Sequence, residues 1–370
     1  MLIRSQNVLM NQLALDDVTY ITNEIDATMN RSRVQPGDVL LNITGASIGR
    51  VTAFDLENTR ANVNQHVCVI RPKSNILLGR YLAHFLCSPE FQAEIDRIQH
   101  GGTRQALTFS QIADFQIPLL PLIEQQRIAQ ILDKAEALRA KRSGALPRLD
   151  TLTQAIFLDL FGDSTTNQKG WPVRPVSDYV SEFQGGKSIE AESTDSAVTK
   201  NRVLKVSAVT VMTFSPHESK PVPDSYDPPT DHFVRVGDLL FSRANTTELV
   251  GAVAYVDATP PNLLLPDKLW RFVWQQPMKV EPLFVWALFQ THAVRREIER
   301  RATGTSGSMK NISQEKVFGI ATILPPLPLQ QEFVRSLAKV KGLKSAQNGS
   351  LVQMCDLFAS LQDRAFRGEL

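Results

Sequence analysis

Apolar and polar residues follow two rhythms along this chain, and each rhythm occurs in both halves. Short stretches with an apolar residue at every second position are bounded by Gly, Asn and Asp, and they predict strands. Longer stretches with apolar residues three or four positions apart, such as LLGRYLAHFLCSPEFQAEIDRI, predict amphipathic helices. The chain is therefore expected to be an α+β protein in which one series of strands and helices is used twice.

The two halves also match in sequence. The segment VQPGDVLLNITGASIGRVTAFD, from Val34, resembles VRVGDLLFSRANTTELVGAVAYVD, from Val234. Further matches follow in the same order: Gly37 with Gly237, Glu94 with Glu297, Ser110 with Ser313, and Gln126 with Gln331. The offset rises in small steps from 200 (237 − 37) to 205 (331 − 126). Such steps are expected of an internal duplication with a few insertions in loops.

Each half ends in a long helical pattern. The first is expected from about Leu122 to Phe161. Its apolar residues recur at helical spacing: Ile128, Ile131, Leu132, Ala135, Leu138, Leu149, Leu152, Ile156 and Leu160. Gly144 and Pro147 should interrupt this helix, because proline lacks an amide donor and clashes with the preceding turn.

The second long helix is expected from about Leu329 to Phe366, with weak points at Gly342 and Gly349. A single apolar stripe on so long a helix needs another helix to cover it. We therefore expect the two long helices to pair antiparallel. Two separate core helices in separate domains are the alternative that periodicity leaves open.

Composition limits the class of protein. Hydrophobic residues make up 43% of the 370 residues and charged residues 21%, which is typical of a folded globular protein. The formal net charge is only +2. A surface for nucleic acid would therefore depend on how the basic residues are arranged.

Cysteines and apolar runs indicate the compartment. Cys68, Cys87 and Cys355 lie in apolar surroundings without a CxxC pair and do not suggest a disulfide framework. The N-terminal sequence has no long apolar run after a basic start, and no stretch approaches the ~20 apolar residues of a membrane span. We expect a cytoplasmic protein without a membrane partner.

Three features together resemble the specificity subunit of type I restriction-modification enzymes. These are PLP or PLI followed by QQ and a long helix, LDTLTQAIFLDLFGD followed by WPVRPVSDYV, and the PGD or VGD strand. The resemblance covers nearly the whole chain and recurs in both halves. It implies two repeated mixed α/β target-recognition domains, residues 1–120 and 164–327, each of which reads one half of a split site in double-stranded DNA.

The same resemblance assigns a role to the helices. Residues 121–163 and 328–370 would form an antiparallel, coiled-coil-like pair that holds the recognition domains in a pseudo-twofold arrangement. The helices would also bind the methyltransferase (modification) subunits, and the motor-nuclease (restriction) subunits would join through the complex.

The two halves differ at their beginnings. The segment WPVRPVSDYVSEFQGGKSIEAESTDSAVTKN, from Trp171, has no counterpart before Met1, because Leu2 already aligns with Val203. The first recognition domain is therefore expected to be incomplete at its N-terminus. It would lack the opening strand and an equivalent of the loop 185–187.

Reading of DNA needs amide, hydroxyl and guanidinium groups on loops, together with cations for phosphates. Both halves carry such residues after the Gly-Asp strand, before the next strand and in a glycine-rich loop. The candidates in the first half are Asn42, Thr44, Ser47, Arg50, Asn64, Gln65, Thr103, Arg104 and Gln105, and His66 belongs to the same polar cluster as Asn64. The candidates in the second half are Lys187, Ser242, Arg243, Asn245, Thr246, Lys268, Thr305, Ser306, Ser308 and Lys310. Any one of them could equally belong to an ordinary polar surface loop.

The sequence lacks the motifs of the relevant enzymes. It has no GxxxxGK[ST] loop for ATP, no GxSxG elbow, and no glycine-rich methyl-donor loop with a matching catalytic motif. The six histidines show no paired metal-ligand spacing, and Trp270 is expected to lie in the core. We expect no catalytic residue, metal or cofactor. Two other interpretations remain: the recognition part of a fused methyltransferase-nuclease, and a helical scaffold without DNA contact.

Overall fold

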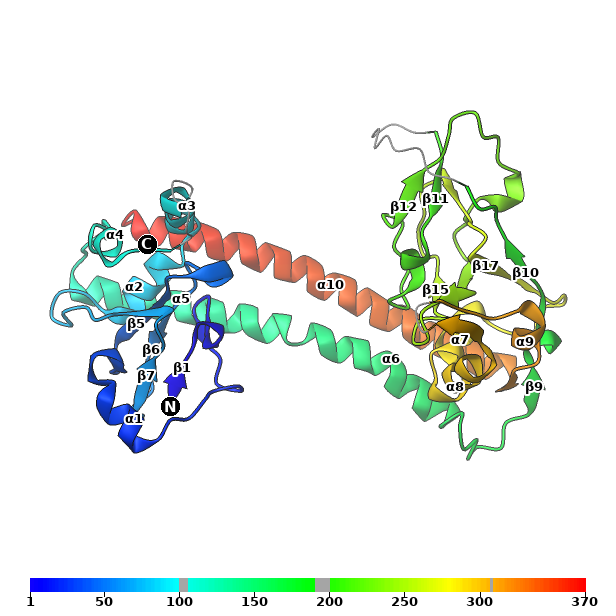
Figure 1. The fold of residues 1–370 in the computed structure, drawn as a ribbon, viewed down its shortest axis with the longest axis horizontal. Helices are drawn as coiled ribbons and strands as arrows, with labels where there is room; N and C mark the ends of the chain where they lie inside the picture. Colours follow the sequence, from blue (N-terminus) through cyan, green and yellow to red (C-terminus); the bar gives the residue numbers. More distant parts are fainter. Residues whose placement is uncertain (100–105, 190–199, 307–308) are drawn as a thin grey trace. The chain divides into compact units, whose positions relative to one another are not determined.

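The computed structural model describes residues 1–99, 106–189, 200–306 and 309–370. The chain divides into two compact units (Figure 1): unit 1 comprises residues 1–146 and 345–370, and unit 2 comprises residues 147–344. Helix α10, Leu327–Phe366, contributes its first part to unit 2 and its last part to unit 1. Both units combine strands with helices, as the sequence predicted.

Unit 1 is built on a three-stranded antiparallel sheet in the order β6-β5-β8. A second small sheet has the order β1-β7-β4, and β2 pairs with β3. The strands are β1 Leu2–Ile3, β2 Val8–Leu9, β3 Gln12–Leu13, β4 Arg33–Val34, β5 Asp38–Asn42, β6 Val51–Phe54, β7 Ala61–Val63 and β8 Val67–Ile70. The helices are α1 Asn23–Thr28, α2 Gly79–Leu86, α3 Pro89–Gln99, α4 Phe109–Ala113 and α5 Leu122–Ser143.

Strand β5 is buried along its whole length because both of its faces are covered. Successive side chains of a strand point to opposite faces of the sheet. Val39 and Leu41 accordingly pack with Leu82 of α2, whereas Leu40 packs with Ile3 and other residues of the smaller sheet. The apolar run after the Gly-Asp pair is thus the centre of unit 1.

Unit 2 is built on a four-stranded antiparallel sheet in the order β10-β17-β13-β15. Smaller sheets have the orders β12-β11-β16, β14-β19-β18 and β20-β9. The strands are β9 Val173–Pro175, β10 Val180–Gly185, β11 Arg202–Leu204, β12 Ser219–Pro221, β13 Leu239–Ser242, β14 Ala244–Asn245, β15 Val253–Tyr255, β16 Leu263–Leu264, β17 Leu269–Trp274, β18 Thr303–Ser306, β19 Met309–Asn311 and β20 Ala321–Ile323. The helices are α6 Leu146–Phe161, α7 Pro282–Phe289, α8 His292–Arg301 and α9 Gln314–Phe318.

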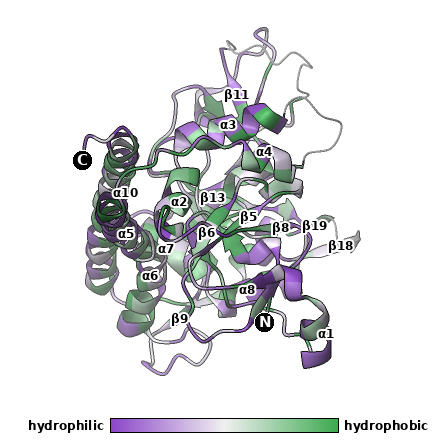
Figure 2. Ribbon diagram, turned by 90° about the vertical axis from the view of Figure 1, so that its left-hand side faces the viewer, coloured by the Kyte–Doolittle hydropathy of each residue, from purple (hydrophilic) through white to green (hydrophobic). Residues whose placement is uncertain are grey.

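Strand β13 is also buried on both faces. Leu239 and Phe241 belong to the largest apolar cluster of unit 2, and Leu240 belongs to a separate cluster on the other face. Figure 2 shows the mainly hydrophobic colouring of strands such as β6 and β13, in contrast to the mixed colouring of the long helices.

Within unit 1, helix α5 packs antiparallel against the last part of α10. Arg127 near the start of α5 donates to the carbonyl oxygen of Leu370 (3.0 Å), and Arg142 near its end donates to Gln347 Oε1 (2.6 Å). Between them, Leu132 belongs to the same buried cluster as Phe358. The last part of α10 therefore covers the apolar stripe of α5.

Within unit 2, helix α6 packs against the first part of α10 through aromatic rings. The ring centroids of Phe157 and Phe161 lie 5.7 Å from that of Phe333 on α10, and Phe161 lies 4.9 Å from Phe284 of α7. Phe161, Phe284 and Phe333 are fully buried. Aromatic residues thus fix this second helix pair.

Three details of the helix prediction can now be assessed. The interruption at Gly144 is confirmed, because α5 ends at Ser143 and α6 begins at Leu146. Gly342 and Gly349, the expected weak points of the second long helix, do not interrupt it, since α10 continues through both. Leu152, one of the residues of the apolar stripe, is 37% exposed, so the stripe is not fully covered at this position.

One match between the two halves needs a correction. Thr108 and Ser313 each cap a short helix by accepting from a backbone amide. Leu107 N donates to Ile43 O (2.9 Å), and Ile312 N donates to Arg243 O (3.0 Å). Ser313 therefore corresponds to Thr108 and not to Ser110. Residue identity misled the alignment by two positions.

Candidate nucleic-acid interface

The loop that follows β5 in unit 1 is closed at its base by backbone hydrogen bonds. Asn42 N donates to Arg50 O (2.8 Å) and Gly49 N donates to Asn42 O (3.0 Å). The loop after β13 in unit 2 has the same closure, since Ser242 N donates to Ala252 O (2.8 Å) and Gly251 N donates to Ser242 O (2.7 Å). Both loops are therefore held by the sheet at their base.

Two of the candidate residues lie at these closures and are not accessible. Asn42 and Ser242 are both fully buried. Asn42 Nδ2 donates to Ser5 O (2.8 Å), and Ser242 Oγ donates to Ala244 O (3.4 Å). The prediction that they contact DNA is wrong in this conformation, because the polar residue at the strand end supports the loop.

Arg243, which directly follows β13 of unit 2, is half-buried. Its guanidinium carbon lies 5.6 Å from the ring centroid of Trp270, in a cation–π contact. Its Nε is buried and has no hydrogen-bond partner among the described residues. Nearby, Asn245 Nδ2 and Thr246 Oγ1 also lack partners among the described residues. The loop thus gathers a guanidinium, an amide and a hydroxyl that each have a buried polar atom with an unmade hydrogen bond.

The glycine-rich segment of unit 2 lies beside this loop. Strand β14 pairs with β19, which places Asn245 opposite Lys310. Lys310 Nζ donates to Gly304 O (2.8 Å) and is solvent-exposed. Thr305 and Ser306 belong to β18, which pairs with β19. Ser308 lies outside the described residues.

Two further candidate cations of unit 2 are Lys187 and Lys268. The exposed Lys187 Nζ lies 5.6 Å from the ring centroid of Tyr226. Lys268 is half-buried, and its carbonyl accepts from Arg243 N (3.1 Å). Both are the type of cation that contacts phosphates.

In unit 1 the structure joins two candidate clusters. Thr44 Oγ1 lies 2.6 Å from His66 Nδ1, so the loop after β5 meets the loop before β8. Asn64 Oδ1 accepts from His66 N (3.2 Å), and Gln65 is exposed. Ser47 and Arg50 belong to the same loop as Thr44, with Arg50 exposed. Thr103, Arg104 and Gln105 lie outside the described residues.

A hollow of about 910 Å³ adjoins this meeting point in unit 1. Its lining includes Arg31, Gln65, His66, Val69 and Phe109. The hollow is flanked by the turn 30–32, which the buried carboxylate of Asp26 holds in place.

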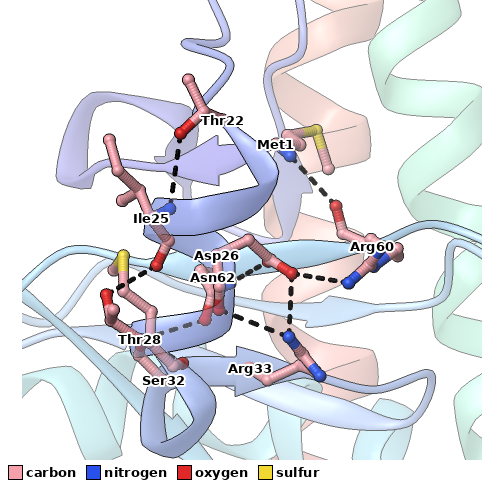
Figure 3. A network of polar contacts seen from close by, with 10 residues as sticks. Met1, Thr22, Ile25, Asp26, Thr28, Ser32, Arg33, Arg60 and Asn62 are labelled. Carbon is pink, nitrogen blue, oxygen red and sulfur yellow. Dashed lines mark hydrogen bonds and ion pairs between the residues drawn. The ribbon is translucent and has the colours of Figure 1, made fainter.

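Asp26 accepts three side-chain hydrogen bonds (Figure 3). The donors are Arg33 (2.8 Å), Arg60 (2.8 Å) and Asn62 Nδ2 (2.6 Å). Asn62 Oδ1 in turn accepts from Ser32 Oγ (3.0 Å), which ties the turn to β7. Because the Asp26 carboxylate and the Asn62 amide are both hydrogen-bonded, the turn is held against β7, although the buried Arg33 Nε has no partner among the described residues.

Sequence reasoning missed the part that Trp270 plays. It assigned Trp270 to the core, and the side chain is indeed only 4% exposed, but its ring also supports Arg243. The pairing of β13 with β17 explains this contact. Phe241 pairs with Trp270, and Arg243 follows Phe241 two positions later on the same face. Recognising it required the register between β13 and β17.

No group of three His, Cys, Asp or Glu side chains that could hold a metal occurs in the described part of the chain. Cys68 and Cys87 are free, and burial raises the pKa of the Cys68 thiol to about 11. Among the described helices, none is long and apolar enough to cross a membrane.

Comparison with known proteins now adds to this geometry. Residues 9–146 match the family described as the type I restriction modification DNA specificity domain. The EcoKI type I restriction enzyme specificity subunit of Escherichia coli (strain K12) is 24% identical, in an alignment that covers 100% of this chain and 82% of that protein. The EcoBI specificity subunit of Escherichia coli is 30% identical over 45% of this chain and 36% of its own length.

A solved structure shows the same fold. One chain from work on the complex assembly and conformational transition of the type I R-M system superposes with a TM-score of 0.60 at 18% identity. The match covers 91% of this chain and 83% of that one. The relatives matched in sequence are type I restriction enzyme specificity subunits. This chain is similar to such subunits along its whole length, and the resemblance predicted from its sequence is confirmed.

Proposed function

We propose that this chain is the DNA-recognition subunit of a type I restriction-modification complex. The observation that carries the proposal is the Arg243 guanidinium, which is supported by Trp270 and has an Nε without a protein partner. A guanidinium fork in a fixed orientation matches the two acceptors on the major-groove edge of guanine. The partnerless atoms Asn245 Nδ2 and Thr246 Oγ1 belong to the same loop, but they are buried and would have to become exposed to join this contact.

Two recognition domains fit this role, residues 1–120 and 164–327, with one half of a bipartite site for each. Support comes from the repeated loop closure at Asn42 and Ser242 and from the polar clusters next to it. The candidates that remain accessible are Thr44, Ser47, Arg50, Asn64, Gln65, Lys187, Arg243, Asn245, Thr246, Lys268 and Lys310.

The helices at residues 121–163 and 328–370 fit the role of docking elements for methyltransferase subunits. Support comes from apolar residues that remain exposed on them, including Leu138 (58%), Leu158 (54%) and Leu357 (61%). Several exposed leucines on the same helices are more consistent with a protein-binding surface than a single exposed leucine is. The chain would supply no catalytic group, and double-stranded DNA, modification subunits and restriction subunits would be its partners in the cytoplasm.

The test is to purify the chain with its cognate methyltransferase subunit and to map the methylated bases across a genome. We expect one bipartite target sequence. Arg243→Ala should relax one position in one half of that sequence and leave the other half unchanged. Methylation without sequence preference, or the same sequence from complexes that lack this chain, would contradict the proposal.

A further inference from the structure

The central sheets of the two units differ by one strand. Unit 2 has the order β10-β17-β13-β15, whereas unit 1 has the order β8-β5-β6. Strand β8 occupies the place of β17, because the same hydrogen bond closes both pairs. Ile43 N donates to His66 O (3.0 Å), and Arg243 N donates to Lys268 O (3.1 Å). In the described part of unit 1, no strand pairs with β8 where β10 pairs with β17.

The outer edge of β8 therefore presents backbone groups without a strand partner. In an antiparallel ladder, hydrogen-bonded and non-hydrogen-bonded pairs alternate. Because residues 43 and 66 form a hydrogen-bonded pair, the pair of Leu40 with Val69 is non-hydrogen-bonded, and the N–H and C=O of Val69 point away from β5. In unit 2, the equivalent residue is Arg271, and it pairs with Gln184 of β10.

The hollow of about 910 Å³ lies along this edge. Val67 and Val69 of β8 form part of its lining, together with Phe109, which is 71% exposed. An exposed edge with an apolar floor is the type of site to which an extended segment adds as a further strand.

Unit 2 shows which chemistry such a segment needs. Gln184 Nε2 of β10 donates to Asp231 Oδ2 (2.8 Å), next to the turn 230–232. The turn 30–32 takes that place in unit 1, where Arg31 stands at the position of Asp231. Within the described residues, the Arg31 guanidinium has no hydrogen bond or ion pair. A segment bound to unit 1 would therefore present an acidic side chain where β10 presents Gln184.

A second requirement comes from Gly186. A Cβ atom added there would lie 1.8 Å from Leu265 O, so the backbone approaches too closely for any side chain. Gly186 N also donates to Pro266 O (3.0 Å). The glycine lets the strand leave the sheet edge next to the neighbouring loop.

We propose that the outer edge of β8 binds an extended segment of a partner polypeptide. The segment pairs antiparallel with β8, carries a glycine where β10 carries Gly186, and presents a carboxylate to Arg31. The proposal does not depend on DNA recognition, since it rests on the edge of the sheet. Asp26 has a positioning role, because its hydrogen bonds hold the turn that carries Arg31 (Figure 3).

The experiment titrates the full chain with a synthetic peptide of residues 176–189, VSDYVSEFQGGKSI, which contains β10. Binding is measured by fluorescence anisotropy, and amide hydrogen exchange is followed at Val67–Ile70. We expect saturable binding and slower exchange in β8. A peptide with Gln184→Glu should bind up to about fivefold more tightly than the unmodified peptide, as expected of one exposed ion pair. A Gln184→Lys peptide should bind more weakly.

Matched variants test separately the backbone pairing at the edge of β8 and the charge of Arg31. Val69→Pro removes the outward N–H of β8 together with part of the apolar packing of the Val69 side chain, and proline is tolerated where a strand faces solvent. It should weaken peptide binding by about fivefold, the equivalent of one hydrogen bond of about 1 kcal/mol. If this variant fails to fold, a peptide with an N-methylated residue 184 tests the same ladder from the other side. Arg31→Ala should abolish the preference for Gln184→Glu, whereas Lys73→Ala, at an exposed loop residue beyond the other end of β8, should not.

Three outcomes would overturn the proposal. The first is an absence of binding and of slower exchange at Val67–Ile70 with every peptide. The second is slower exchange in β8 caused by double-stranded DNA and not by peptide, which would assign the hollow to nucleic acid. The third is amide exchange in β8 that slows as the protein concentration rises in the absence of peptide, which would assign the edge to contact between copies of this chain.

Discussion

The Arg243 guanidinium lies over the indole ring of Trp270, with 5.6 Å between the guanidinium carbon and the ring centroid. Trp270 is itself fixed, because its ring stacks with Phe241 at 5.9 Å and 11° and contacts Phe183 at 5.6 Å. A cation on a buried ring loses little conformational entropy when it binds. The Arg243 guanidinium is thus held in an orientation from which it can donate to a planar acceptor.

Arg243→Ala should relax the choice of base at one position of one half-site. The expected cost is about 1–3 kcal/mol in discrimination, as for a bidentate contact with guanine. The measurement is methylation mapping with the partner methyltransferase, in parallel with binding to target and non-target DNA. Arg235→Ala is the control, because Arg235 is an exposed arginine of unit 2 in a different loop. An unchanged target sequence with Arg243→Ala would exclude base reading by this residue.

Lys310→Ala should act differently, through phosphate. Lys310 is half-buried, and its side chain bonds only to the uncharged Gly304 O among the described residues, so its charge remains available. Loss of one phosphate contact should weaken binding to target and non-target DNA by similar factors and lower the slope of log K against log salt by about one. Salt titrations of the complex measure both quantities. A change in the methylated sequence would show instead that Lys310 reads bases. Lys279→Ala is the control, because it removes the same net charge at a different position.

An ion-paired aspartate links helix α5 to helix α2 within unit 1. Asp133 accepts from His84 Nε2 (2.7 Å) and from Arg80 Nε (2.8 Å). Burial raises the pKa of the Asp133 carboxyl, but the His84 hydrogen bond and the Arg80 charge outweigh it, so that the pKa is lowered overall. The charged form is therefore favoured in the folded protein.

This lowered pKa predicts a pH dependence. An aspartate with a lowered folded-state pKa stabilises the protein above its unfolded pKa, and this contribution is lost as the pH falls through the folded-state value. The Tm difference between wild type and Asp133→Asn should therefore be constant at neutral pH and should shrink below about pH 4. Thermal unfolding from pH 3 to pH 7 measures it. Asp114→Asn, at an exposed residue, should show no such trend.

The sequence predicted the elements better than it predicted the roles of their polar residues. Residues 38–42 and 239–242 were recognised as strands because their apolar character is intrinsic to the segment. Accessibility is not intrinsic: Asn42 and Ser242 look like polar loop residues, but their strands carry them into the interior. The role of Trp270 beneath Arg243 depends on strand register, which no local pattern specifies.

The long helices show the same limit. Gly144 and Pro147 ended α5 as expected, because two residues unfavourable to a helix lie close together at one place. Gly342 and Gly349 did not interrupt α10, because an isolated glycine costs only about 1 kcal/mol in a helix, which the other residues of a 40-residue helix can offset.

Leu152→Asp should impair assembly with the methyltransferase subunit and leave the fold intact. Leu152 is 37% exposed on α6, so a charge there is not forced into the interior of unit 2. By contrast, Phe333→Ala opens the buried aromatic contact with Phe157 and Phe161 and should cost about 3–5 kcal/mol of stability.

The two effects can be separated by measuring both stability and assembly. Urea unfolding should shift strongly for Phe333→Ala and little for Leu152→Asp, whereas co-purification with the methyltransferase should fail for Leu152→Asp at a concentration where wild type assembles. Thr151→Asp introduces the same charge one position away, on a residue that is already polar and exposed, and should assemble normally. If Leu152→Asp assembles as well as Thr151→Asp, the exposed face of α6 is not a docking surface. A selective failure of Leu152→Asp would assign the exposed apolar face of α6 to the partner, because the same charge on the adjacent polar position leaves that face unchanged.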